Sequence, residues 1–293
     1  MKILRILLIT LGLSILAACG GGGSAPVTQG SISGVVTKGP VRTAQVSAYA
    51  ISGGVKGAQI GTATTDVTGA FTMNIGAYAG AVMLQTSGGS YTDEATGSPM
   101  SMAPGDVMTA VMPAVVANAS TNGIQVTPVT AMAQVWAQGL PGGMTDANIA
   151  AANAALGQYF SVSDILRTAP MNPLVAGSGT GASQDARNYG ITLAAMSRYA
   201  ATTIGMMNSS ALVKAYMRDA PDGVMDGREG VSQISMPMGG MGGTSMMTST
   251  ACTSDLATAM TAFMNDLTMN KSGLTATDMA TLITKLTASN GHI

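Results

Sequence analysis

The sequence contains very few of the residue types that catalysis commonly uses. It has one histidine, His292, and only two glutamates, Glu94 and Glu229. Since a catalytic triad needs a rigidly positioned base, a single histidine beside the last residue is a poor candidate for one. The sequence also lacks a Gly-x-Ser-x-Gly turn and a glycine-rich phosphate loop with its lysine. We therefore expect no enzymatic activity.

Charged residues are also scarce, at 9% of the chain, and they nearly balance, with 13 Lys and Arg against 14 Asp and Glu. Nucleic-acid binding needs a basic surface, so nucleic acid is excluded as a partner. Disorder driven by charge is excluded as well, because 46% of the residues are hydrophobic. Only 4% are aromatic, so the core must be built from small aliphatic side chains and from 24 methionines.

The hydrophobic run at the N-terminus is too short to be a comfortable membrane span. Lys2 and Arg5 form a basic start, residues 6–16 are mostly apolar, and two small residues follow. As a helix, residues 6–16 would measure about 16 Å, against a hydrocarbon core of about 30 Å. This order of features is typical of a secretory signal peptide, which we place at residues 1–18.

The four residues Leu16-Ala17-Ala18-Cys19 resemble the lipobox of bacterial lipoproteins. The resemblance implies that the Cys19 thiol receives diacylglycerol, that cleavage occurs just before it and that its amino group is acylated. Gly20 follows where lipoproteins of the inner membrane often carry aspartate, so the resemblance implies the outer membrane, on its periplasmic face or at the cell surface. Several acyl chains together anchor a protein stably. The alternative is an ordinary secreted protein with an incidental cysteine.

The only other cysteine is Cys252, which would have no partner within the chain in an oxidising compartment. We favour a buried thiol that acts as a small apolar residue. The alternative is an exposed thiol that forms mixed disulfides or a dimer.

A flexible tether and a strand-rich region follow the lipobox. Residues 19–30 are rich in glycine, which predicts the tether. Residues 31–126 alternate between apolar and polar side chains, as in Phe71-Thr72-Met73-Asn74-Ile75. This period of two predicts strands that bury one face.

Three segments of this region resemble the carboxypeptidase-regulatory-like domain, namely Ser33 to Val41, Ala44 to Tyr49 and Thr65 to Phe71. The resemblance implies an antiparallel, transthyretin-type β-sandwich, with a hairpin turn at Gly69 and Phe71 in the core. It implies little about function, because this module is an accessory in many exported proteins.

The adjacent carboxylates Asp93 and Glu94 come at the end of this resemblance. Such a pair can serve in acid/base chemistry or bind a cation, but no third ligand or basic partner lies nearby in the sequence. We expect instead a solvated loop after a strand.

The pattern becomes helical at Thr127-Pro128, a pair that favours a helix start. Helical spacing is found over residues 146–160 and again over 255–270, where Leu267 is expected on the buried face. A last helix is predicted from Thr275, with a reciprocal cap at Asp278. It is clearest in a stripe of apolar residues: Leu193, Met196, Ala200, Ile204 and Met207. We therefore predict an α+β protein, with a β-sandwich over residues 31–126 and an α-helical bundle over 127–293. Uncharacterised proteobacterial lipoproteins have a similar arrangement.

A calcium site is one interpretation of Asp222, Asp226 and Glu229. However, an EF-type loop needs an oxygen ligand at its third position, where this sequence has Val224. We prefer the interpretation that the segment consists of two Asp-Gly turns after a helix.

Methionines are concentrated between residues 236 and 247, in a glycine-rich stretch that predicts a flexible loop. They are Met236, Met238, Met241, Met246 and Met247. Thioethers suit soft ions such as Cu(I) or Ag(I), so a soft-metal site is one hypothesis. The alternative is that methionine serves only as an adaptable filler, because the whole chain is rich in it.

These observations predict a lipid-anchored module of the cell envelope with a binding or structural role. Its partner would be an envelope protein or a glycan, and no cofactor is expected. The alternative function is soft-metal binding, with Cu(I) held by the methionine-rich stretch.

Overall fold

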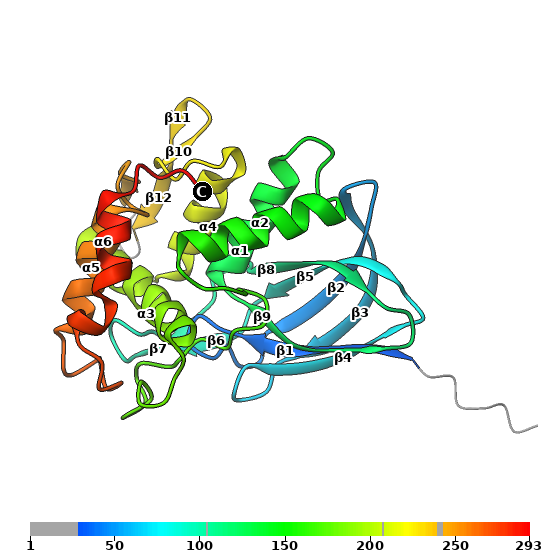
Figure 1. Ribbon diagram of the computed structural model, residues 1–293, viewed down its shortest axis with the longest axis horizontal. Helices are drawn as coiled ribbons and strands as arrows, with labels where there is room; N and C mark the ends of the chain where they lie inside the picture. The colour runs from blue at the N-terminus through cyan, green and yellow to red at the C-terminus, as the bar shows by residue number, and fades with distance from the viewer. Residues whose placement is uncertain (1–28, 104, 207, 239–242) are drawn as a thin grey trace, which may run out of the picture.

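The computed structural model describes residues 29–293, except for 104, 207 and 239–242. Strands dominate the first part of this range and helices most of the second part, so the α+β class is confirmed. Cys19, the predicted signal peptide and nearly all of the predicted tether lie outside the described residues. Figure 1 shows the two large sheets toward one end of the molecule and most helices toward the other.

In the described part of the chain, nine strands precede helix α1. Their bounds are β1 Gly30–Val36, β2 Gln45–Ser52, β3 Val55–Thr64, β4 Ala70–Gly76, β5 Gly80–Ser87, β6 Ser90–Thr92, β7 Pro99–Ser101, β8 Thr109–Val115 and β9 Ser120–Val126. The larger sheet has the order β3-β2-β5-β8, the smaller has the order β4-β1-β9, and β6 pairs with β7.

One strand pair departs from the predicted antiparallel arrangement. Strand β1 pairs with β9 in parallel, with Ser31 opposite Ser120 and Val36 opposite Val126, while the other strand pairs among the described residues are antiparallel. An alternating pattern specifies which face of a strand is buried, but it does not specify the direction of the neighbouring strand.

The two large sheets contribute to one apolar cluster. Strand β1 alternates strictly between buried and half-buried residues, and its buried Ile32 and Val36 lie in the same cluster as Val46 and Leu84 of the larger sheet. Gly34 is required by close contact within the smaller sheet, since a Cβ atom there would lie 2.0 Å from the carbonyl oxygen of Ile124.

The turn predicted at Gly69 is confirmed, but the hairpin is wrong, because the flanking strands β3 and β4 belong to different sheets and do not pair. Gly69 has φ of 80°, in the left-handed region that glycine adopts without strain. The Asp66 carboxylate fixes the turn, because it accepts hydrogen bonds from the backbone N–H groups of Thr68 and Ala70 at 2.7 and 3.0 Å. Phe71 follows and is buried, as the resemblance implies.

Six α-helices follow the strands in the described part of the chain. Their bounds are α1 Pro128–Gly139, α2 Asp146–Tyr159, α3 Gln184–Arg198, α4 Ser210–Asp219, α5 Ser254–Met264 and α6 Ala280–Ala288. The helix start predicted at Thr127 is confirmed: the Thr127 hydroxyl accepts the backbone N–H of Thr130, and Thr130 returns a bond to the N–H of Thr127. None of the described helices is long and apolar enough to cross a membrane.

The helices pack directly on the larger sheet. Ala81, Met83 and Val111 of β5 and β8 belong to the same apolar cluster as α1 and α2, and Val213 of α4 joins the cluster between the sheets. Strands β5 and β8 therefore bury both faces over most of their length. The strand-rich and helix-rich parts share a core.

The helix expected over residues 255–270 ends earlier than predicted. Helix α5 stops at Met264, and Leu267 is 81% exposed instead of buried. The Asp266 carboxylate accepts the backbone N–H and the hydroxyl of Thr268, at 3.1 and 2.6 Å. Such local bonds offer the backbone an alternative to the helix. The cap predicted at Thr275 and Asp278 is confirmed, on a 3₁₀ turn that precedes α6.

Gly190→Ala is expected to destabilise the protein by about 1–3 kcal/mol, although alanine favours a helix by about 1 kcal/mol over glycine. Gly190 lies in α3 against the segment at Met171, and a Cβ atom there would lie 1.9 Å from the Met171 carbonyl oxygen. Urea unfolding measures the loss. The control is Gly243→Ala, whose Cβ would meet only Met238 side-chain atoms, the nearest at 3.9 Å. Equal stability of the two variants would contradict the expectation.

Candidate functional site

A cluster of buried polar side chains lies where the 90–106 segment meets helices α3 and α4. Asp93 and Glu94 are each 2% exposed, so the expectation of a solvated loop is wrong. The segment turns inward because one Asp93 oxygen accepts the backbone N–H groups of Ala95 and Thr96, at 3.1 and 3.2 Å. This local turn places both carboxylates inside the protein.

Lys38 is the cation of this cluster, and it is fully buried. Its Nζ lies 3.4 Å from Oε2 of Glu94 and also donates to the Ser197 hydroxyl. The same hydroxyl donates to Glu94 Oε2 at 2.6 Å. Gly39 permits this approach, because a Cβ there would lie 2.3 Å from the carbonyl oxygen of Thr92.

Three carboxylates of the strand-rich part each accept a serine hydroxyl from the helical part. Glu94 accepts Ser197 at 2.6 Å, Asp93 accepts Ser209 at 2.5 Å, and Asp106 accepts Ser210 at 2.5 Å. Charge-assisted hydrogen bonds of this length are the strong ones. The three bonds therefore tie the two parts together through polar contacts inside the molecule.

The electrostatic balance favours the protonated form of Lys38. Burial alone would lower its pKa, but Glu94, Tyr91 and Asp93 outweigh burial and raise the pKa of Lys38 above its ordinary value. The Lys38 Nζ also lies 5.4 Å from the centre of the Tyr91 ring. While it is protonated, Lys38 can donate a proton toward Ser197 but cannot accept one from it as a general base.

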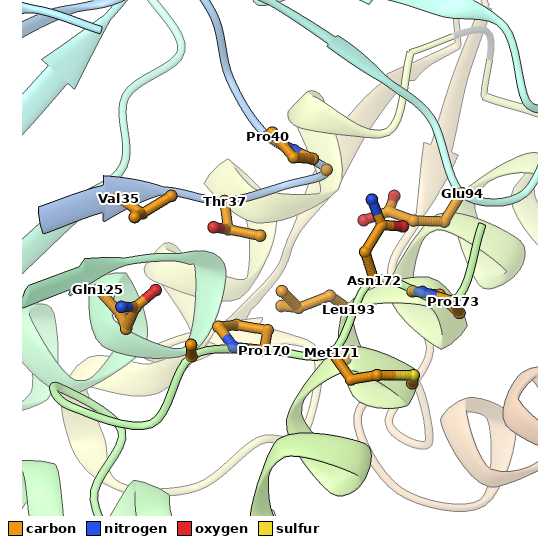
Figure 2. Close-up of a pocket in the computed structure, with 13 residues that line it drawn as sticks. Val35, Thr37, Pro40, Glu94, Gln125, Pro170, Met171, Asn172, Pro173 and Leu193 are labelled. Atoms are coloured by element: carbon orange, nitrogen blue, oxygen red, sulfur yellow. The ribbon is translucent and has the colours of Figure 1, made fainter. Parts of the chain in front are cut away.

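A pocket of about 130 Å³ adjoins this cluster and uses Glu94 in its wall. It lies between the end of β1, the Gly39-Pro40 turn, α3 and the segment 169–173, which is mostly apolar and contains two prolines. Figure 2 shows Glu94 and Asn172 on one side of the pocket, and Val35 and Gln125 on the opposite side.

A second hollow, of about 220 Å³, lies on the other side of the same turn. It shares Gly39, Pro40 and Asn172 with the first pocket and adds Arg42. The two hollows together offer apolar surface with a few convergent polar groups, which is typical of binding sites.

No protein-family model and no curated protein matches this chain. Among solved structures, it is weakly similar to a 9R-lipoxygenase from Cyanothece, with 12% sequence identity and a TM-score of 0.22. The aligned part covers 35% of this chain, which spans only 17% of the lipoxygenase chain. A likeness this weak carries no argument about fold or function.

The structure does not bring the predicted calcium ligands together. Asp222 and Asp226 each accept the backbone N–H two residues further on, at 3.0 and 3.1 Å, and Glu229 pairs with Arg218 at 2.6 Å. Among the residues that the structure describes, no three His, Cys, Asp or Glu side chains could hold a metal ion. The preferred interpretation of two Asp-Gly turns agrees with positive φ values of 82° and 77° at the two glycines.

Asp219, which the sequence analysis did not single out, is the acidic residue that organises these turns. It is 1% exposed at the end of α4, and one of its oxygens accepts the N–H groups of Gly227 and Arg228 at 2.8 and 3.0 Å. Its other oxygen, Oδ2, is buried and has no hydrogen-bond partner among the residues that the structure describes. Burial raises the pKa of Asp219 to about 7, although the two backbone bonds act in the opposite direction.

Four of the five predicted soft-metal ligands are described, and they lie in different surroundings. Strands β12 (Ser235–Met238) and β13 (Gly243–Met246) form a hairpin, so the stretch is more regular than the expected loop. Met236 and Met247 are buried in the core beside the helices, Met238 is half-buried, and Met246 is 52% exposed. Met241 lies outside the described residues.

The hairpin register places Met246 on the face opposite to Met236 and Met238. Met236 lies opposite Ser245 and Met246 lies opposite Ser235, so Met236 and Met246 project from opposite faces of the hairpin. Burial of Met236 and Met247 fits the role of an adaptable filler. Binding of Cu(I) by this stretch stays a prediction.

Cys252 is fully buried, as the favoured interpretation of this residue expects. Burial raises the pKa of its thiol well above the ordinary value, with a further contribution from Asp219. A thiol in this state is a poor nucleophile, since the thiolate is the reactive form.

Proposed function

We propose that this protein is a lipid-anchored binding module of the outer membrane. In this proposal Cys19 carries the lipid, residues 19–30 are the tether, and the pocket beside Glu94 holds a segment of an envelope protein or a glycan. The signal-like N-terminus and the residues that resemble a lipobox support the anchor.

The position of the pocket relative to the tether is the observation that carries the proposal. Strand β1 begins at Gly30, directly after the tether, and the pocket lies at the other end of β1, at Val35 and Thr37. A strand of this length spans about 20 Å. Figure 1 shows that β1 begins at the end of the molecule opposite to α5 and α6. An anchor at Cys19 would therefore leave the pocket away from the membrane surface.

The proposed architecture is a transthyretin-like β-sandwich joined to a helical bundle. The apolar cluster shared by the two large sheets supports the sandwich. The single apolar cluster that includes residues of all six α-helices supports the bundle. Because serine–carboxylate bonds and a shared core connect the two parts, they would act as one rigid body that holds the pocket open.

Lipidation is tested by Cys19→Ala, which is expected to abolish labelling by a fatty-acid probe and to move the protein from the membrane to the soluble fraction. Cys252→Ala is the matched control, because that thiol is buried and should leave both properties unchanged. A Cys19→Ala variant that still carries label and still fractionates with membranes would refute the anchor.

The binding role is tested by photo-crosslinking in intact cells. A photoreactive residue at Asn172, which lies in both hollows, is expected to capture a partner. The same residue at Val231, which is 92% exposed and lies elsewhere, is expected to capture none. Protease or glycosidase treatment of the adduct then distinguishes a protein from a glycan. Equal adducts at both positions, or none at Asn172, would contradict the pocket.

A further inference from the structure

The contacts of Lys38, Ser197 and Glu94 form a continuous path for proton transfer. Lys38 Nζ donates to the Ser197 oxygen, and the Ser197 hydroxyl donates to Glu94 Oε2. Lys38 and Ser197 are fully buried and Glu94 is 2% exposed. The binding role proposed above does not need a charged lysine at these contacts. Burial of the Lys38–Glu94 ion pair also carries a desolvation cost.

We propose that Lys38 and Glu94 condense to form an intramolecular isopeptide bond, with Ser197 as the proton relay. The nitrogen and the acceptor carboxylate are held in contact, with Nζ 3.4 Å from Oε2. Reacting groups fixed in this way gain the large effective concentration of an intramolecular reaction. A neutral amide would also remove the cost of keeping two opposite charges out of water.

The step balances without any other reactant. The Lys38 ammonium passes one proton through the Ser197 hydroxyl to Glu94, which leaves a neutral amine beside a neutral carboxylic acid. Lys38 Nζ then bonds to Glu94 Cδ, and one Cδ–O bond breaks. The departing oxygen takes a second proton from nitrogen and leaves as water. The cross-linked protein is lighter than the starting protein by one water molecule, and the step involves no oxidation or reduction.

Glu94 is the acceptor, in preference to the neighbouring Asp93. The oxygens of Asp93 are occupied by the N–H groups of the Ala95-Thr96 turn and by the hydroxyl of Ser209. The Lys38 nitrogen forms its hydrogen bonds with Glu94 and Ser197. The bond would connect the turn after β1 to the turn after β6, across a sequence separation of 56 residues.

A tryptic digest of the denatured, full-length protein tests the bond. Trypsin releases the tetrapeptide Gly39-Pro40-Val41-Arg42 only if it cleaves after a free Lys38. We expect this peptide to be absent from the wild-type digest and present in that of Glu94→Ala. The wild-type digest should instead contain a branched peptide about 18 Da lighter than its two parts, the mass of one water. Full release of the tetrapeptide from the wild type would overturn the proposal.

Two further variants test the assigned roles. Asp93→Ala is expected to retain the cross-link, so its digest should lack the tetrapeptide. If the digest of Glu94→Ala also lacks the tetrapeptide, Lys38 is still cross-linked and the acceptor has been assigned wrongly. Ser197→Ala is expected to slow formation of the bond. Digests of the freshly made variant should then release the tetrapeptide, and its amount should fall as the protein is incubated before digestion. Complete cross-linking of Ser197→Ala from the first time point would refute the relay. Because the digest follows denaturation, poor folding of a variant does not hide Lys38 from trypsin.

Discussion

Replacing Lys38 with methionine is expected to lower the free energy of unfolding by about 3–5 kcal/mol, the usual cost of removing one partner of a buried ion pair. The variant leaves the Glu94 carboxylate buried without a cation, and Asp93 nearby adds a second negative charge. Methionine fills a similar volume, so the loss reports the charge more than the packing. Urea unfolding followed by circular dichroism at pH 7 measures the difference.

Lys56→Met is the matched control for this experiment. Lys56 is exposed, and its Nζ contacts Gln85 at 2.7 Å and lies 3.8 Å from the centre of the Tyr49 ring. Exposed contacts of this kind contribute about 1 kcal/mol or less. If both variants lose the same free energy of unfolding, the buried Lys38–Glu94 pair contributes no more to stability than an exposed lysine contact.

The double variant Lys38→Met/Glu94→Leu removes both charges and separates the ion pair from the proposed covalent bond. An apolar replacement of a buried ion pair is often neutral, so the double variant should recover most of the stability if only the pair is lost. If the isopeptide bond has replaced the ion pair in the wild type, the double variant lacks a cross-link that restricts the unfolded chain, and recovery is incomplete.

Asp219→Asn is expected to remove a pH dependence of stability. The pKa of Asp219 is about 7 in the folded protein, above its ordinary value of 3.8, so the folded state binds more protons between these values. The free energy of unfolding therefore falls as the pH rises from about 4 to 7, by at most about 1.4 kcal/mol per pH unit. The contribution is fully lost above pH 7. Asparagine cannot ionise and keeps an oxygen for the two backbone N–H groups.

The measurement for Asp219 is a series of urea unfolding curves between pH 4 and pH 8. We expect the variant to gain stability relative to the wild type as the pH rises, until the difference levels off above about pH 7. Asp222→Asn is the control, because that side chain is exposed and should leave the slope unchanged. A constant difference between Asp219→Asn and wild type at every pH would refute the ionisation argument.

Local sequence signals predicted the elements well where the physical cause is local. The Thr127 cap depends on contacts three residues away, and the turn at Gly69 depends on neighbours within four residues. The buried cluster depends instead on partners that are remote in sequence. Glu94 contacts Lys38 across 56 residues and Ser197 across 103. Because no partner lies nearby in the sequence, Asp93 and Glu94 were predicted to lie in a solvated loop.

The same limit applies to the methionines. Composition showed an enrichment between residues 236 and 247, but it could not show which sulfurs point into the core. That division follows from the hairpin register, which pairs Met236 with Ser245, and from helices that cover one face. In the sequence, the two strands of this hairpin are indicated only by a short alternation of apolar and polar residues, and the glycines between the strands interrupt that pattern.

The pairing of β1 has a mechanical consequence if Cys19 is anchored as proposed. Tension between the membrane and a bound partner would enter the folded body at Gly30 and act along β1. This strand is hydrogen-bonded on both edges, to β4 on one side and to β9 on the other. A force along the strand must shear both ladders at once, whereas an edge strand peeled from its end would release its bonds one after another. The body is therefore attached at a point that resists pulling.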